Sequence, residues 1–334
     1  MPVAEIFGSA DAVITEAYQN GAPLSVVNNK VLGVATLRDQ MTKTQITVVS
    51  STAAYILNLE AYTKVIDEES DLAVFDVSTN NVDGYYVLKG DVECTGETLW
   101  TNHFGTAATN DLFYFNGILD GNGHAIRGLK VGNNGLFGVL GAKAIIRNIA
   151  FTDVKLSATD AWKYSCTLAH SSVASTGSGS AIENVYIHIK DFHTSNSGNR
   201  TAGLMFIYNK DIKINNVVMV IDSKNLTTDP EYGYGALFEH DRIKGTAPNM
   251  TNVYVVSAVM PMSMHVQKNA AQPENAALYA GNDKDTAGKI EKGLMIYYTG
   301  VKRYDDLAGL SAAVSQVGNW SVSANGIAWT AIAE

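Results

Sequence analysis

The sequence predicts an all-β chain in which a small β-sandwich precedes a right-handed parallel β-helix, or solenoid, with capping elements. Short segments rich in β-branched residues alternate with Gly, Asn and Asp turns, and the 334 residues include 29 glycines but only 6 prolines. One asparagine recurs at intervals of 36, 32 and 36 residues, as Asn148, Asn184, Asn216 and Asn252. A second marker, a small residue followed by apolar residues, precedes each of them and begins at Gly135, Thr167, Gly203 and Gly235.

Net charge and cysteine count limit the classes of partner and site that this chain can have. The formal net charge of −9 argues against nucleic acid and acidic lipid, because both require a basic surface. The two cysteines, Cys94 and Cys166, are too few for a disulfide framework and too far apart for a zinc knuckle, so we expect buried free thiols. We expect no cofactor, no metal and no insertion into a membrane, since no run approaches the roughly 20 apolar residues that span a bilayer.

Residues 1–63 are expected to form the β-sandwich. A hairpin over Asn28-Asn29 is followed by two strands of β-branched and aromatic residues, around residues 45–50 and 54–62. The segment resembles the immunoglobulin-like modules of bacterial surface proteins and phage virions, although it has no Cys–Trp–Cys core. The first eight residues lack the basic and apolar regions of a signal peptide, so we expect either use without Sec export or a trimmed chain.

Residues 64–114 are expected to link the sandwich to the solenoid and to cap it. Asp67 can cap a short helix whose Leu72, Ala73 and Phe75 face inward, and a strand–turn–strand segment follows from Gly84. Such a cap would cover strand edges that an open solenoid end exposes.

Residues 115–260 carry the repeats. A solenoid coil bends sharply between strands, and asparagine adopts the left-handed backbone conformation of such bends at low cost. Stacked coils place Asn148, Asn184, Asn216 and Asn252 above one another, so we expect their amides to form a hydrogen-bonded ladder. The Asp120-Gly-Asn-Gly sequence starts like a calcium loop but has Val131 at its twelfth position, which favours a turn.

Two stretches within residues 84–258 carry a family resemblance. Gly135-Leu-Phe-Gly, with the upstream Phe115-Asn-Gly-Ile-Leu-Asp-Gly-Asn-Gly-His, resembles the GLUG-motif β-helix proteins of bacterial surfaces and phages. This resemblance implies a β-helix fold and contributes no catalytic residue, because the family motif is structural.

Residues 261–334 are expected to form a loop and a C-terminal cap. Residues 267–289 are polar and predict a long loop, and Gly293–Tyr298 predicts a strand. The pattern of Tyr304–Val317 is typical of an amphipathic helix, and a final hairpin turns at Asn325-Gly326.

Two sets of residues are candidates for a site. Asp153, Asp191 and Asp222 follow the recurring asparagines by five to seven residues, so they could align as catalytic carboxylates or as solvated strand-end charges. Aromatic residues near the loops could stack on glycans or pack beneath the loops. These are Trp162, Tyr164, Tyr232 and Tyr234.

We therefore expect a non-enzymatic structural or adhesive protein. The favoured hypothesis is a bacteriophage virion component on the virion surface, such as a head fibre, decoration protein or tail-spike-like protein. Its expected partners are other virion or cell-surface proteins and host glycans, and homo-oligomers stay open. The alternatives are a secreted bacterial cell-surface adhesin and a polysaccharide lyase or glycosidase.

Overall fold

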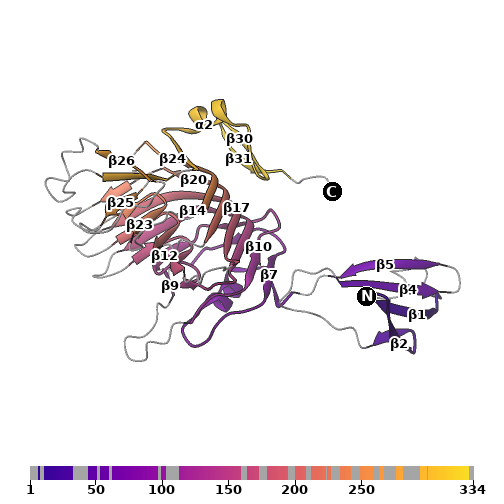
Figure 1. Cartoon of the computed structure of the whole chain (residues 1–334). Coiled ribbons are helices and arrows are strands. Elements are labelled where there is room, and N and C mark those ends of the chain that lie inside the picture. The colour runs from indigo at the N-terminus through magenta and orange to yellow at the C-terminus, as the bar shows by residue number, and fades with distance from the viewer. Residues whose placement is uncertain are drawn as a thin grey trace. The chain divides into compact units, whose positions relative to one another are not determined.

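The chain divides into two compact units, Met1–Lys64 and Val65–Glu334. A computed structural model supplies the coordinates (Figure 1). The structure describes residue 7 and residues 11–32, 44–50, 53–59, 62–96, 99–102, 113–158, 164–172, 179–194, 200–207, 212–222, 224–226, 234–241, 249–258, 263–266, 276–280, 294–298 and 300–330. The all-β class and the parallel solenoid are confirmed.

The N-terminal unit contains one antiparallel sheet in the order β3-β2-β1-β4-β5. Its strands are β1 (Ile14–Gln19), β2 (Ala22–Val27), β3 (Lys30–Leu32), β4 (Thr44–Ser50) and β5 (Ala54–Leu59). Ile14, Ile46 and Val48 are buried on one face. The turn at Asn28-Asn29 joins β2 to β3, as expected, with positive φ at both residues. The described residues of this unit form no second sheet, so the sandwich stays a prediction.

The second unit is built from parallel strands stacked coil upon coil (Figure 1). The main sheet follows the order β28-β24-β20-β17-β14-β10-β7-β6, with shorter strands beside it. Its strands are β6 (Lys64–Ile66), β7 (Tyr85–Leu88), β8 (Val92–Glu93), β9 (Trp100–Thr101), β10 (Ile118–Asp120), β11 (Ala125–Arg127), β12 (Lys130–Asn133), β14 (Ile145–Ala158), β17 (Ala181–Thr194), β20 (Lys213–Ile221), β21 (Lys224–Leu226), β24 (Asn249–Val256) and β28 (Val301–Tyr304).

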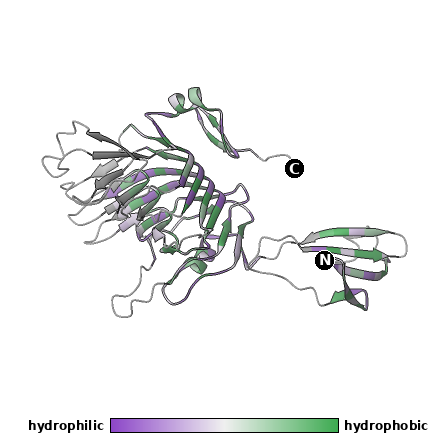
Figure 2. Ribbon diagram, in the orientation of Figure 1, coloured by the Kyte–Doolittle hydropathy of each residue, from purple (hydrophilic) through white to green (hydrophobic). Residues whose placement is uncertain are grey.

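Two smaller parallel sheets complete the coils. One has the order β13-β16-β19-β23-β25 and the other β15-β18-β22. These strands are β13 (Val139–Leu140), β15 (Tyr164–Cys166), β16 (Ala169–Ser172), β18 (Arg200–Ala202), β19 (Met205–Ile207), β22 (Tyr234–Gly235), β23 (Phe238–Asp241) and β25 (Ser263–Val266). Hydrophobic and hydrophilic residues alternate along the strands of the main sheet (Figure 2), which is the pattern of a sheet with one buried face.

The recurring asparagines bend the long strands. Asn148, Asn184, Asn216 and Asn252 have φ between 52° and 54°, the left-handed conformation expected for them. The Nδ2 atoms of Asn184, Asn216 and Asn252 each donate to Oδ1 of the preceding asparagine, at 3.2, 3.0 and 3.1 Å. The ladder is therefore continuous over four coils.

The spacing of the asparagines in the sequence does not show how the ladder begins and ends. At its start, Asn148 Nδ2 donates to Asp120 Oδ1 at 3.1 Å, so an aspartate replaces the amide. At its other end, Val301 pairs with Val253, which places Gly300 on Asn252. Gly300 has φ of 84° but no side chain, so it keeps the bend and ends the ladder.

The marker glycine is offset by one residue in its last copy. Ala202 pairs with Gly235 and Met205 with Phe238, so Ala236 stacks on Gly203. A Cβ at Gly203 would collide with the Ala236 carbonyl oxygen, which explains the small residue there. The marker residue Gly235 therefore stacks on Ala202 rather than on Gly203.

The first coil is closed by η1 (Glu69–Phe75), a 3₁₀-helix. Leu72 and Phe75 are buried in the solenoid core, where the Phe75 ring lies 5.1 Å from that of Phe137 and 5.6 Å from that of Phe115. Two details differ from the prediction: the N-cap residue is Glu68 rather than Asp67, and Ala73 is exposed because the tighter 3₁₀ turn rotates it out of the core.

The C-terminal segment packs on the flank of the coils. It comprises α2 (Leu307–Ala313), β29 (Gln316–Val317), β30 (Trp320–Ser323) and β31 (Gly326–Trp329). Leu310, Val317 and Val322 cover Val218 and Val256, outward-facing side chains of β20 and β24. The helix is shorter than expected: Asp306 caps its start through the Gly309 N–H, and it ends at Ala313. The final hairpin is confirmed, but its turn is Ala324-Asn325, because Gly326 already pairs with Ser323.

The stretch before this segment contains a hairpin. β26 (Ala276–Ala280) pairs antiparallel with β27 (Leu294–Tyr298), the strand expected there. The prediction of an uninterrupted loop over residues 267–289 is therefore wrong, because an alanine-rich strand gains its stability from pairing rather than from its own propensity. Other residues of that stretch lie outside the described part.

Candidate functional site

Charged side chains cross successive coils on the outward side of the main sheet, and we call them the charged stripe. They lie on or beside β8, β11, β14, β17 and β20. The side-chain alternation places them outward, because Ile126, Ile187 and Ile189 are fully buried on the inward side. The stripe comprises Asp91, Glu93, His124, Arg127, Thr152, Asp153, His188, Lys190 and Asp222.

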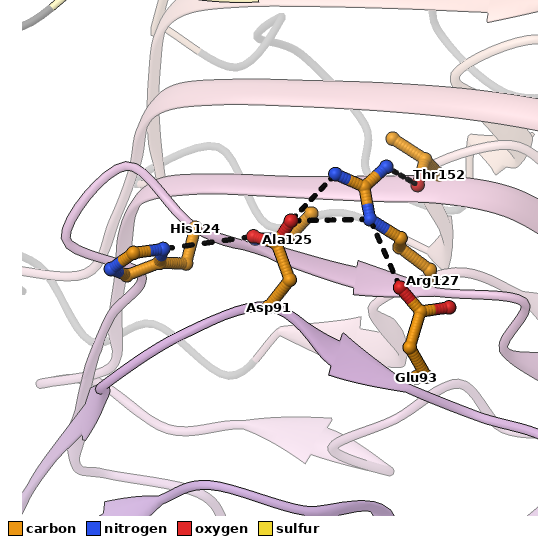
Figure 3. Close-up of polar contacts among 6 residues, drawn as sticks. All are labelled: Asp91, Glu93, His124, Ala125, Arg127 and Thr152. Atoms are coloured by element: carbon orange, nitrogen blue, oxygen red, sulfur yellow. Dashed lines mark hydrogen bonds and ion pairs between the residues drawn. The ribbon is translucent and has the colours of Figure 1, made fainter.

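Arg127 is the centre of the first group (Figure 3). Its Nη2 lies 2.6 Å from Asp91 Oδ2 and its Nε lies 3.3 Å from Glu93 Oε1. Its Nη1 donates to Thr152 Oγ1 at 3.3 Å on the next coil. His124 Nδ1 lies 3.6 Å from Asp91 Oδ1, which also accepts the Ala125 N–H at 2.9 Å. The group therefore ties together three consecutive coils.

These contacts shift two pKa values. Burial alone would raise the pKa of Asp91, but the hydrogen bonds from Arg127 and the Ala125 N–H outweigh it, so the pKa of Asp91 is lowered. The hydrogen bond to Asp91 likewise raises the pKa of Arg127. Both side chains are therefore held in their charged forms.

Asp91 should contribute to stability in a pH-dependent way. Because its folded pKa lies below the ordinary value of 3.8, the contribution is present above that value and is lost as pH falls through the folded pKa. We expect Asp91→Asn to cost the same free energy of unfolding at pH 7 and pH 5, and less at pH 3. Urea titrations of both proteins measure this difference. Asp67→Asn is the control, since the Asp67–Lys89 pair is long, at 3.5 Å, and exposed. An Asp91→Asn cost that does not shrink at pH 3 contradicts the assignment.

The second group joins two of the three predicted carboxylates. His188 Nε2 lies 2.8 Å from Asp222 Oδ2, and His188 Nδ1 lies 3.8 Å from Asp153 Oδ1. Lys190 Nζ lies 3.8 Å from the same Asp153 oxygen. Asp153 has φ of 54° at an irregularity in the pairing of β14 with β17. The third candidate, Asp191, pairs with Lys155 in the ladder of strands.

Tyr186 lies beside this group, where β17 meets the C-terminal segment. Burial, and then the charges of Asp222 and Asp153, raise its pKa to about 12. Its ring centroid lies 5.8 Å from that of Trp320. The phenol therefore stays protonated in neutral solution and can donate a hydrogen bond.

Of the four predicted aromatic side chains, that of Tyr164 lies within the described part of the structure. Trp162 and Tyr232 lie outside the described residues, as does the side chain of Tyr234. Tyr164 is half-buried, and its ring packs edge-on against His170 at 5.1 Å. For Tyr164 the packing interpretation therefore fits better than a stacking platform.

A partly buried ion pair accompanies the start of the ladder. Arg147 Nε lies 2.7 Å from Asp120 Oδ2, and Arg147 Nη2 donates to the Tyr85 hydroxyl at 3.4 Å. Asp120 Oδ1 also accepts the Asn122 N–H at 2.9 Å, so the Asp-Gly-Asn-Gly sequence forms a turn. This aspartate is occupied by structural contacts.

Sequence reasoning missed most of the stripe. Arg127 and His188 belong to different coils, and only the strand register brings Arg127 beside Glu93 and Thr152. The usable signal was alternation, and only for His188, which lies between Ile187 and Ile189. Within the described ranges, no group of three or more His, Cys, Asp or Glu side chains is placed to hold a metal ion.

The stripe can hydrogen-bond a polar ligand and can hold a proton between carboxylates. Its planar carboxylate and guanidinium groups match hydroxyl-rich ligands, and the His188–Asp222 contact could serve proton transfer. In the described part of the chain, no helix is long and apolar enough to cross a membrane. No protein-family model, curated protein or solved structure matches the chain.

Proposed function

We propose that this protein is a non-enzymatic structural and adhesive surface protein whose solenoid presents the charged stripe to a host glycan. The observation that carries the proposal is the ion pairing of the stripe across consecutive coils. Arg127 is bonded to Asp91 on one side and to Thr152 on the other, so these side chains are held in place before a ligand binds. Paired charges suit hydrogen bonding to hydroxyl groups better than they suit acid–base chemistry.

A glycan array with the whole chain tests the adhesive role. We expect the wild type to bind host-surface glycans and Arg127→Met to lose about tenfold or more of the affinity, the size expected for losing hydrogen bonds to a charged group. Lys213→Met is the matched control, because Lys213 is an exposed cation on β20 outside the stripe. Equal binding by both variants and the wild type would remove the stripe from the adhesive role. No binding by any protein would leave a structural role alone.

We favour a virion component, such as a head fibre, decoration protein or tail-spike-like protein, over a secreted bacterial adhesin. The resemblance of Gly135-Leu-Phe-Gly to the GLUG-motif proteins supports either one. Co-purification of the chain with phage particles would support the virion role. A secretion leader encoded directly upstream would instead support the adhesin.

A second candidate is a polysaccharide lyase or glycosidase. The specific observation in its favour is the placement of Asp153 and Asp222 on either side of His188. Reducing-sugar and unsaturated-product assays on host polysaccharides decide this point. Activity that is lost in Asp153→Asn and kept in Asp191→Asn would overturn the non-enzymatic proposal.

We also infer a right-handed coil and an immunoglobulin-like N-terminal sandwich. Parallel crossover connections are right-handed in about 98% of cases, which supports the handedness. The antiparallel order of β1–β5 supports half of such a sandwich. An experimental structure with a left-handed coil, or with a lone sheet, would correct these inferences.

A further inference from the structure

The last coil of the solenoid differs from the earlier coils in its core. β28 is the edge strand of the main sheet and pairs with β24, with Val253 opposite Val301 and Val255 opposite Arg303. Paired residues of parallel strands point the same way, so Val301 and Arg303 face the core side. Among the described strands, none pairs with the free edge of β28.

Arg303 interrupts a column of apolar core residues. The column runs through successive coils as Phe151, Ile187, Met219 and Val255, all fully buried. At the next position the side chain is a guanidinium that is 27% exposed. Its Nε and Nη2 donate to the Ser257 carbonyl oxygen at 3.1 and 2.8 Å, and Nη2 lies 3.2 Å from Asp305 Oδ1.

We propose that β28 prevents a second copy of this chain from pairing with the end of the solenoid, and that Arg303 is the residue responsible. A strand that paired with its free edge would cover the guanidinium and remove it from water. The exposed Asp305 carboxylate, its ion-pair partner, would then have to offset the desolvation of a buried charge. Inward-pointing charges protect sheet edges in this way. Gly300, directly before this strand, ends the asparagine ladder, so neither the core column nor the amide ladder offers a continuation.

The test compares two neighbouring substitutions in the whole chain. Arg303→Val places an apolar residue at this position, like the residues that fill the column in the earlier coils. Lys302→Val removes the same charge from the outward face of the same strand, where the side chain is exposed. We expect Arg303→Val to form concentration-dependent dimers and larger species in light scattering after gel filtration. Lys302→Val should keep the mass of the wild type at every concentration.

Hydrogen exchange locates the contact. In Arg303→Val, the peptide covering residues 300–306 should gain protection as concentration rises, and that of Lys302→Val should not. If Arg303→Val does not fold, as judged by circular dichroism, Arg303→Met tests the same point with a side chain of similar length. A folded Arg303 variant with wild-type mass throughout would overturn the proposal, as would association without protection of β28.

Discussion

Replacing Asn184 with alanine is expected to lower the free energy of unfolding by about 2–5 kcal/mol. Alanine at φ of 53° costs about 1–2 kcal/mol relative to a residue that tolerates the left-handed conformation. Asn184 also donates to Asn148 and accepts from Asn216, and each lost hydrogen bond costs about 0.5–1.5 kcal/mol. Because the ladder is continuous, the loss also leaves both neighbouring amides without one partner.

Urea unfolding followed by tryptophan fluorescence measures this effect in the solenoid alone, since all four tryptophans lie beyond residue 64. Asn184→Gly separates the two causes, because glycine removes the amide and keeps the backbone conformation. Asn122→Ala and Asn122→Gly are the matched controls, because Asn122 is an exposed turn residue with φ of 51° outside the ladder. If Asn184→Gly costs no more than Asn122→Gly, the ladder amides do not stabilise the fold.

Replacing Phe75 with alanine is expected to cost about 3–5 kcal/mol, the range for emptying a fully buried phenylalanine site. The ring makes edge-on contacts with Tyr86, Phe115 and Phe137, so its loss opens a cavity at the first coil. The same fluorescence-detected urea titration applies.

Ala73→Ser on the same helix is the control, with an expected change below about 0.5 kcal/mol because the side chain is exposed. A small effect of Phe75→Ala would mean that η1 is not required to close the core.

The coil architecture could be predicted because its cause is local. The conformation that asparagine tolerates at φ near 53° recurs wherever the chain turns the same corner, so Asn148, Asn184, Asn216 and Asn252 mark the coils in the sequence. The next corner escaped prediction because Gly300 lies 48 residues after Asn252, with the hairpin of β26 and β27 between them. A glycine satisfies the backbone there without continuing the motif.

The candidate site could be predicted only in part. Asp153 and Asp222 were identified from their position after the recurring asparagines, but His188, which joins them, carries no such signal. Asp191 lies one residue further from its asparagine than Asp222 does, and the irregular pairing of β14 with β17 assigns it to another contact. The centre of the first group, Arg127, follows a turn that sequence reasoning treated as structural.

By itself, the sequence determined the parallel solenoid, its asparagine corners and its buried alternation, because these follow from the conformational preferences and polarity of single residues. Tertiary structure decided which charges meet in the stripe, that the C-terminal segment covers Val218 and Val256, and that Arg303 ends the core column. Those features depend on the register between coils. Loops of unequal length set that register, and neither periodicity nor composition records it.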